Sequence, residues 1–292
     1  MSTITFVGTG AIGLPMAVQL ARSGHTVVAV DPFEGARQRA VQSKLEAVAE
    51  IRDAPRSDIV VVMVATPAQL DTLVSQADSD LSGQTWVIMS TVGPGAVREQ
   101  GERLAERGAR VVDAPVTGGV ARAVSGELVI FASAEPQALE DATAALDSLG
   151  TVRIVGSALG EGRGIKIVNQ HLAAVHIAAA AEALNLAESL GLDRAEVLDL
   201  VSAGAAGSWM LSDRGPRMLM GTDAPVMSTV GIFVKDTGLV AGAAASSGAD
   251  VPLLRAAQER FALAAEAGLG GRDDSRVIET YQQRQHDDRP TG

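Results

Sequence analysis

The first 31 residues constrain the fold more than any other segment of the chain. β-Branched and aromatic residues at 4–7 predict a strand, the turn GTGAIG follows at Gly8–Gly13, and Leu14–Ser23 has the apolar periodicity of a helix. A second predicted strand, His25–Val30, ends at Asp31, 18 positions after the last glycine of the turn. A strand, a glycine turn, a helix and an acidic strand end in this order predict a parallel, dinucleotide-binding sheet.

The residues of the glycine turn have separate expected roles. Gly8 allows the tight turn, Gly10 lets the backbone approach a pyrophosphate, and Gly13 lets the helix pack closely. Ala11 and Ile12 lie where the amino terminus of the helix would face the phosphates. The alternative is a glycine-rich turn that binds nothing.

Asp31 indicates which dinucleotide is bound. A carboxylate at this place accepts hydrogen bonds from both ribose hydroxyls and repels a 2′-phosphate, so NAD is favoured over NADP. Arg37 and Arg39 follow closely. They either weaken this preference or lie on an exposed helix face.

Strand and helix patterns continue to alternate up to residue 155. Ligands bind beyond the carboxyl ends of parallel strands, so Thr66 and Thr91 are candidate cofactor contacts. Thr117, Gly118 and Gly119 form a candidate substrate loop, because two glycines after a threonine can turn N–H groups and a hydroxyl toward a carboxylate. In isolation this tripeptide would be only a turn. The further expected elements are strands at 58–64, 86–89, 110–113, 128–133 and 152–155 and a helix at 135–149.

The stretch from Gly160 to Leu190 is glycine-rich for five residues and then helical. A helical wheel drawn from Lys166 places Asn169 and Gln170 within roughly 60° of the lysine. His171 lies on the far side and receives no primary role. The alternative for Lys166 is a solvated lysine near a helix start, but its glycine neighbours let a ligand come close.

After this helix only helical patterns occur, at 194–202, 208–220, 228–247 and 252–267. The predicted fold class is therefore α/β, with an N-terminal Rossmann-type doubly wound sheet, a long interdomain helix and a C-terminal all-α domain. The predicted boundaries are 1–160 for the NAD-binding domain, 161–190 for the linker and helix, and 191–292 for the all-α domain. The polar end, 282–292, is expected to fray.

Composition excludes several classes of protein. The net charge of −11 disfavours nucleic acid and anionic membrane surfaces as partners, since both need a basic footprint. The absence of cysteine excludes disulfides and thiolate metal sites, and no metal site is expected. A first strand near Ile4 leaves no room for a signal peptide, and the run Leu172–Leu184 is too short to span a bilayer. We therefore expect a soluble, cytoplasmic protein that binds a small anionic ligand.

Four motifs in order carry a resemblance: GTGAIG, DAPVTGGVARAVSGELVIFASA at 113–134, GIKIVNQ at 164–170 and FVKDTGLVAGAA at 233–244. With them the chain resembles the β-hydroxyacid dehydrogenases, a family that includes 3-hydroxyisobutyrate dehydrogenase and tartronate semialdehyde reductase. A longer match through HLAAVHIAAAAEALNLAESLGL, GSWML and IFVKD is similar to the L-threonate dehydrogenase branch.

The resemblance implies roles for particular residues. The family's catalytic lysine falls on Lys166, its substrate loop on Thr117–Gly119, and its cofactor-contacting lysine on Lys235. The family often has two asparagines where this chain has Asn169 and Gln170, which suggests altered substrate placement. The family forms dimers or tetramers, so a homodimer or homotetramer is expected. The alternative for Lys235 is a buried pair with the neighbouring aspartate.

The leading hypothesis is NAD-dependent oxidation of a 3-hydroxy sugar acid, or the reverse reaction. Lys166 would act as general acid/base, and burial favours the neutral form that a base requires. Asn169 and Gln170 would orient the hydroxyl and the lysine, and the Thr117–Gly119 loop would hold the carboxylate. Arg122 could reach the far end of a polyhydroxylated acid. The alternative for Arg122 is a surface arginine.

Other functions remain open at this point. Within the enzyme class, the alternatives are a tartronate semialdehyde, sulfolactaldehyde or 3-hydroxyisobutyrate-type reductase or dehydrogenase. An imine reductase would usually carry Asp or Tyr in place of Lys166. A non-catalytic NAD-binding scaffold would be expected to lack this lysine.

Overall fold

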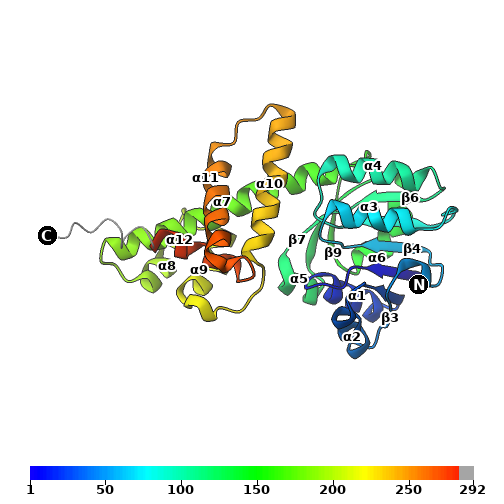
Figure 1. Ribbon diagram of the computed structural model, residues 1–292, viewed down its shortest axis with the longest axis horizontal. Helices are drawn as coiled ribbons and strands as arrows, with labels where there is room; N and C mark the ends of the chain where they lie inside the picture. Colours follow the sequence, from blue (N-terminus) through cyan, green and yellow to red (C-terminus); the bar gives the residue numbers. More distant parts are fainter. Residues whose placement is uncertain (283–292) are drawn as a thin grey trace. The chain divides into compact units, whose positions relative to one another are not determined.

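The computed structural model describes residues 1–282. The chain divides into two compact units, Met1–Lys166 and Ile167–Gly292, here named the sheet unit and the helical unit. The division falls inside one long helix, α7 (Glu161–Ser189), which is labelled in Figure 1. The domain boundaries predicted from the sequence stay a prediction.

The sheet unit contains a nine-stranded sheet in which β3, β2, β1, β4, β5 and β6 lie side by side and parallel. This is the strand order of doubly wound dinucleotide-binding folds, so the predicted Rossmann-type sheet is confirmed. Beyond β6, strand β8 runs antiparallel to β6 and β7 and parallel to β9. The strands are β1 (Thr3–Val7), β2 (Thr26–Val30), β3 (Glu46–Val48), β4 (Ile59–Val62), β5 (Thr85–Ile88), β6 (Arg110–Asp113), β7 (Val116–Thr117), β8 (Leu128–Ser133) and β9 (Gly150–Gly156).

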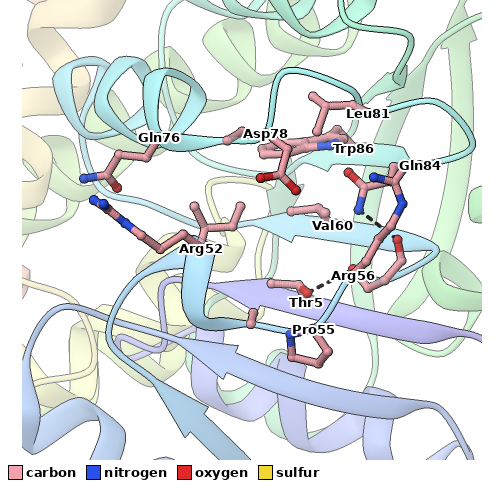
Figure 2. A pocket seen from close by; sticks show the side chains of 14 residues that line it. Thr5, Arg52, Pro55, Arg56, Val60, Gln76, Asp78, Leu81, Gln84 and Trp86 are labelled. Carbon is pink, nitrogen blue, oxygen red and sulfur yellow. Dashed lines mark hydrogen bonds between the residues drawn. The ribbon is translucent and has the colours of Figure 1, made fainter.

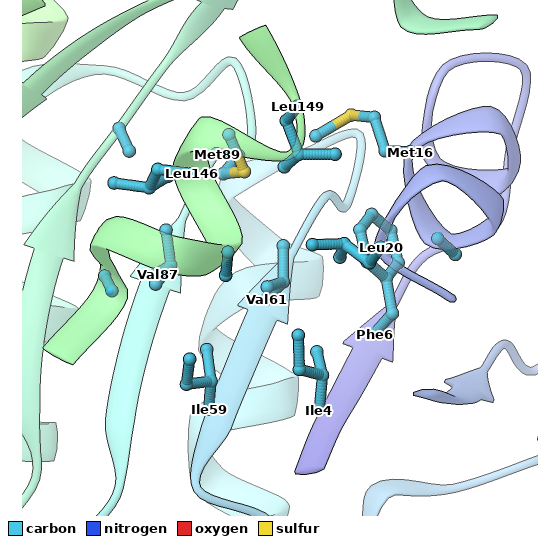
Figure 3. Close-up of a cluster of buried hydrophobic side chains, with 14 of the residues drawn as sticks. Ile4, Phe6, Met16, Leu20, Ile59, Val61, Val87, Met89, Leu146 and Leu149 are labelled. Atoms are coloured by element: carbon cyan, nitrogen blue, oxygen red, sulfur yellow. The ribbon is translucent and has the colours of Figure 1, made fainter. Parts of the chain in front are cut away.

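Side chains of the central strands alternate between two apolar clusters, because successive residues of a strand point to opposite faces. Ile59 and Val61 of β4 contribute to the cluster in Figure 3, together with residues of α1 and α6. Val60 and Val62 contribute to the other cluster, with residues of α3 and α4. The sheet is thus covered on both faces. Its helices are α1 (Gly13–Arg22), α2 (Glu34–Gln42), α3 (Pro67–Gln76), α4 (Pro94–Ala105), α5 (Gly119–Ser125) and α6 (Pro136–Asp147).

The helical unit contains no strand among its described residues, as the sequence predicts. Its core includes Ile177 of α7, Leu198 of α8 and Leu211 of α9, and the rings of Phe233 and Phe261 stack with centroids 4.9 Å apart. The remaining elements are α8 (Arg194–Ser202), α9 (Trp209–Leu219), α10 (Val230–Ser247), α11 (Pro252–Ala264), the short 3-10 helix η4 (Asp274–Ile278) and α12 (Glu279–Gln282).

The sequence analysis gave no range for several elements of the sheet unit, among them β3, β7 and α5. These three have only 3, 2 and 7 residues, too few for a periodicity to be recognised. No helix within residues 1–282 combines the length and apolarity needed to cross a bilayer. The expected fraying at 282–292 falls almost wholly outside the described residues.

Candidate active site

The glycine turn between β1 and α1 shows which glycines are sterically required. Gly8 has a φ of +95°, and a Cβ there would lie 2.5 Å from the carbonyl oxygen of Met63. A Cβ on Gly13 would lie 1.9 Å from the carbonyl oxygen of Gly8. A Cβ on Gly10 would meet nothing within 4 Å. The backbone is therefore uncovered at Gly10, next to the amino terminus of α1, which fits the space that a pyrophosphate needs.

Asp31 lies beside this turn at the end of β2 and is 6% exposed. Its Oδ2 accepts hydrogen bonds from the backbone N–H of Thr9 at 2.9 Å and from the Thr9 hydroxyl at 3.2 Å. Its Oδ1 accepts one from the N–H of Phe33 at 3.0 Å. A carboxylate offers roughly four lone-pair positions, so capacity for a ribose hydroxyl remains. Thr9 holds Asp31 against the glycine turn, a contact that the sequence reasoning missed.

The two arginines after Asp31 differ. Arg37 is half-buried, and its Nη1 donates to the carbonyl oxygens of Asp31 at 2.9 Å and Pro32 at 2.8 Å. Arg39 is exposed. Arg37 therefore binds the backbone of the turn between β2 and α2, whereas Arg39 faces solvent.

The loops after β4 and β5 are joined, since the Ser90 hydroxyl accepts a hydrogen bond from the N–H of Val64 at 2.8 Å. Thr66 caps helix α3: its hydroxyl accepts from the N–H of Gln69 at 3.2 Å, and the Gln69 side chain accepts from the N–H of Thr66 at 3.1 Å. Thr91 is half-buried in the next loop. Cofactor contact by the two threonines stays a prediction, and the Thr66 hydroxyl has a structural role besides.

The predicted substrate loop follows β6. Gly118 and Gly119 have φ values of +135° and +70°, which side-chain-bearing residues rarely adopt. A Cβ on Gly118 would lie 2.8 Å from Cδ of Arg122, so the arginine stem lies against the loop. Thr117 and Arg122 are both half-buried. The fold thus brings Arg122 next to the predicted substrate loop.

The start of α7 is held by a buried ion pair that the sequence reasoning missed. Arg163 and Asp113 are both 0% exposed in their side chains, with Nη1 3.2 Å from Oδ1. Oδ2 of Asp113 also accepts hydrogen bonds from the N–H groups of Gly160 at 3.0 Å and Arg163 at 3.1 Å. The Ser133 hydroxyl accepts from the N–H of Gly162 at 2.9 Å. Helix α7 is therefore bound to the point where β6 and β8 end.

Burial dominates the electrostatics of this pair. Loss of solvent raises the pKa of Asp113 above its ordinary value, although the charge of Arg163 opposes the change. Burial likewise lowers the pKa of Arg163. The sequence held a signal for the pair: an aspartate ends an apolar strand, and an arginine lies in a glycine-rich stretch. Nothing local could connect the two.

Lys166 lies on α7 less than one turn beyond Arg163 and is only 7% exposed. On this helix, Asn169 and Gln170 follow at the i+3 and i+4 positions, which share a face with the lysine. Asn169 is half-buried and Gln170 is buried. The role of Lys166 as general acid/base stays a prediction, and its burial departs from the solvated alternative.

Within the helical unit, four polar side chains form a continuous series. Asn169 Nδ2 donates to Gln170 Oε1 at 2.9 Å, and Gln170 Nε2 donates to Asp236 Oδ2 at 2.5 Å. The other oxygen of Asp236 lies 3.2 Å from Nζ of Lys235. Asp236 was considered only as a partner of Lys235 in the sequence reasoning, so its bond to Gln170 was missed.

A small cavity of about 50 Å³ lies elsewhere in the sheet unit and is shown in Figure 2. It is lined by Thr5, Val60, Gln84 and Trp86, from the early positions of β1 and β4 and the start of β5. The predicted site residues follow the opposite, carboxyl ends of these strands. The cavity is therefore separate from the candidate site.

Two family models together match almost the whole chain. Residues 3–160 match the NAD binding domain of 6-phosphogluconate dehydrogenase. Residues 160–281 match a model described as NAD-binding of NADP-dependent 3-hydroxyisobutyrate dehydrogenase.

Individual proteins give the same picture. The L-threonate dehydrogenase of Cupriavidus necator is 38% identical over 286 residues, covering 95% of each chain. The crystal structure of 3-hydroxyisobutyrate dehydrogenase from Salmonella typhimurium superimposes with a TM-score of 0.88 at 33% identity, covering 95% of this chain and 99% of that one. The Mycobacterium tuberculosis 3-hydroxyisobutyrate dehydrogenase with L-serine gives a TM-score of 0.83 at 27% identity, covering 96% and 99%.

Proposed function

The chain belongs to the β-hydroxyacid dehydrogenase family of NAD-binding oxidoreductases, and from this premise we propose that it oxidises a hydroxylated sugar acid such as L-threonate, using NAD and Lys166. The observation that carries the proposal is the burial of Lys166 on a helix whose first turn is bound to the end of β6. At 7% exposure the amine has little contact with bulk solvent, so a proton it exchanges passes to a bound group rather than to bulk water.

Each group of site residues has a separate task in this proposal. The N–H groups of Gly118 and Gly119 and the Thr117 hydroxyl bind the substrate carboxylate, because left-handed backbone turns several N–H groups toward one side. Lys166 accepts the proton of the hydroxyl that is oxidised. NAD, when bound, supplies the hydride acceptor. Asn169 and Gln170 orient the substrate hydroxyls.

The cofactor is proposed to be held by Gly8–Gly13, Asp31, Thr66 and Thr91, with Lys235 adding a positive charge. The backbone exposed at Gly10 and the position of Asp31 beside it fit a dinucleotide. One matching family model carries NADP in its description, so the choice of dinucleotide rests on Asp31. We expect NAD to exceed NADP by at least about tenfold in kcat/KM. Equal efficiency with the two cofactors would contradict this part of the proposal.

A sugar acid is preferred as substrate for two reasons. Several relatives more than 30% identical are named L-threonate dehydrogenases. Arg122 lies against the substrate loop, and a guanidinium suits hydroxyl-rich or doubly anionic ligands. Initial rates with L-threonate, D-erythronate, 3-hydroxyisobutyrate and L-serine, each with NAD, would identify the substrate class. Turnover of 3-hydroxyisobutyrate alone would overturn the assignment.

The role of Lys166 is tested by Lys166→Ala. Water must then take the proton, so kcat should fall by roughly 10²–10⁴, and the pH profile of oxidation should lose the limb set by this lysine. NAD affinity should change little. Lys44→Ala is the matched control, because Lys44 is exposed and lies after α2. A Lys166→Ala enzyme with the wild-type kcat and pH profile would show that the proton leaves by another route.

We also propose that the chain forms a homodimer or homotetramer. The helical unit exposes large apolar side chains, including Leu186 at 56%, Leu190 at 66% and Leu200 at 68%. Such surfaces are often covered by a partner. Light scattering after size-exclusion chromatography would give the mass, and a monomer at micromolar concentration would contradict the proposal.

A further inference from the structure

The hydrogen bonds that join Asn169, Gln170 and Asp236 can run in only one donor-to-acceptor direction, with Lys235 at the far side of Asp236. A carboxylate can only accept hydrogen bonds, so Asp236 requires Gln170 to point its NH₂ group toward it. The carbonyl oxygen of Gln170 then faces Asn169, which must donate with its own NH₂ group. The carbonyl oxygen of Asn169 is thereby directed away from Gln170, as an acceptor.

Burial makes this direction costly to reverse. Asp236 is 3% exposed and Gln170 is 8% exposed, so water cannot replace a lost partner. If Gln170 turned over, its carbonyl oxygen would face the Asp236 carboxylate and its NH₂ group would face that of Asn169. If Asn169 turned over, its carbonyl oxygen would face that of Gln170. Asn169, by contrast, is only half-buried, so part of this residue is open to a ligand.

The length of Gln170 allows the connection. Asp236 lies on α10, 66 positions away in sequence, and Gln170 bonds it while also contacting Asn169. The family resemblance places a shorter asparagine at position 170, one methylene less than glutamine. In this chain the longer amide of Gln170 therefore lets Asp236 fix the orientation of the Asn169 amide.

We propose that Asp236 is a positioning residue that, through Gln170, makes Asn169 present a hydrogen-bond acceptor to a substrate hydroxyl next to the carbon that is oxidised. This inference rests on the proposed function. It makes the pair Gln170–Asp236 a determinant of specificity: a substrate with a hydroxyl at that place donates to Asn169, whereas a substrate with a methyl group leaves the acceptor unpaired.

Asp236→Asn should reverse the orientation of the amide groups of Gln170 and Asn169. The ammonium of Lys235, which lies 3.2 Å from the outer oxygen of Asp236 as an ion pair, would attract the carbonyl oxygen of the new Asn side chain and repel its NH₂ group, which then faces Gln170. Gln170 and then Asn169 would turn over, and Asn169 would present NH₂ instead of oxygen. We expect kcat/KM for L-threonate to fall roughly 10- to 100-fold and kcat/KM for 3-hydroxyisobutyrate to change much less.

The double variant Asp236→Asn, Gln170→Glu should restore the original direction. The carboxylate introduced at position 170 would accept from the new Asn side chain with one oxygen and from Asn169 with the other. We expect kcat/KM for L-threonate to return to within about threefold of wild type. A merely structural role of Asp236, or a need for negative charge at that position, predicts no such recovery.

Controls separate the possible failures. Gln170→Asn keeps both charges but shortens the amide, and it should lower kcat/KM for L-threonate as Asp236→Asn does. Asp250→Asn removes a surface carboxylate that is 78% exposed and should leave the kinetics unchanged. Thermal unfolding of each variant confirms that it is folded.

Two results would count against the inference. Wild-type kcat/KM in Asp236→Asn, or a double variant no better than the single one, would overturn the positioning role and leave the proposed function standing. If the wild-type chain turns over none of the hydroxy acids, the proposed function itself is wrong and the inference fails with it.

Discussion

The two units bury charged side chains in contrasting ways. In the sheet unit, Asp113 and Arg163 form a single ion pair, and both side chains are fully buried. Arg163 gives one further hydrogen bond, to the carbonyl oxygen of Ile88 at 2.9 Å. Burial is the largest influence on both groups, raising the pKa of Asp113 and lowering that of Arg163. The ion pair and the hydrogen bonds that Asp113 accepts from the N–H groups of Gly160 and Arg163 do not offset this desolvation.

In the helical unit, charges form a network between α9 and η4. Arg217 lies 3.0 Å from both Asp213 and Asp273, and Arg214 bonds Asp274 at 2.9 Å. Burial opposes ionisation of Asp273, but hydrogen bonds from the Ser275 side chain, the Met227 N–H and Arg217 lower its pKa.

The innermost carboxyl of the network behaves like Asp113. Asp274 is 0% exposed, and burial raises its pKa in spite of Arg214. The pKa of Arg214 is raised even though burial opposes this, because the charge of Asp274 and then Asp213 favour the cation. Asp113, Asp273 and Asp274 are all at most 1% exposed and each pairs with an arginine. The comparison therefore teaches that charge pairing alone does not decide whether a buried carboxylate is stabilised, and that the balance between its desolvation and the hydrogen bonds it accepts does.

The largest effect is expected from Arg163→Met. It leaves the Asp113 carboxylate buried without its cation, so the free energy of unfolding of the sheet unit should fall by about 3–5 kcal/mol. Trp86 is 1% exposed in this unit, and the chain has only two tryptophans. In a Trp209→Phe background, urea unfolding followed by Trp86 fluorescence therefore reports on the sheet unit.

Two controls accompany this experiment. The double variant Asp113→Asn, Arg163→Met removes both charges and should recover at least about 1 kcal/mol. Asp71→Asn breaks the partly exposed contact with Arg103 and should cost less than about 1 kcal/mol. A loss in Arg163→Met no greater than in Asp71→Asn would show that the buried pair does not need its cation.

A smaller effect is expected from Arg217→Met in the network. Asp273 would keep its hydrogen bonds from the N–H groups of Met227 at 2.9 Å and Ser275 at 3.1 Å, and the Asp213 side chain, 34% exposed, could take up water. The helical unit should lose about 1–3 kcal/mol. Amide hydrogen exchange of peptides from α9 and η4 measures this unit by itself. A loss as large as that of Arg163→Met would mean that the network has no redundancy.

The parts predictable from the sequence are those set by local spacing. The bounds of β6, β8 and α8 agree with the expected ranges, because each is a run or periodicity read over neighbouring residues. The shared face of Lys166, Asn169 and Gln170 follows from helical geometry alone. The fold class and the family were likewise predicted correctly from ordered motifs.

The contacts that fix the site could not be predicted in this way. Asp113 and Arg163 are 50 positions apart, and Gln170 and Asp236 are 66 positions apart. Their pairing depends on where strands end and helices cross, which a single sequence does not specify. Thr66 shows a related gap. Its place after a strand predicted ligand contact, while its capping box with Gln69, which spans only four residues, was overlooked.

The dependence of stability on pH differs in sign between Asp273 and Asp113. The folded pKa of Asp273 lies below its unfolded value, so its contribution is fully present above the unfolded pKa, about 4, and is lost as the pH falls through the folded pKa. For Asp113 the folded pKa is raised, so its contribution is present below the unfolded pKa and is lost as the pH rises through the folded pKa.

Unfolding measured between about pH 3 and pH 7 tests both signs. The difference in unfolding free energy between wild type and Asp273→Asn should shrink as the pH falls below about 4. The difference between wild type and Asp113→Asn should shrink in the opposite direction, as the pH rises. If both free-energy differences changed with pH in the same direction, Asp113 and Asp273 would not differ in the sign of their pKa shift.

The smallest effect is expected where water reaches the carboxylate freely. Asp58 is exposed and accepts hydrogen bonds from the N–H and the hydroxyl of Thr3, both at 2.8 Å. The backbone bond from Thr3 is the main reason that the pKa of Asp58 is lowered, so its contribution, like that of Asp273, is lost as the pH falls through the folded pKa. Asp58→Asn should cost only about 0.5 kcal/mol at pH 7, since solvent replaces the lost bonds. A double-mutant cycle with Thr3→Ala isolates the pair. A coupling energy as large as the loss in Arg163→Met would show that burial does not enlarge the contribution of a paired carboxylate.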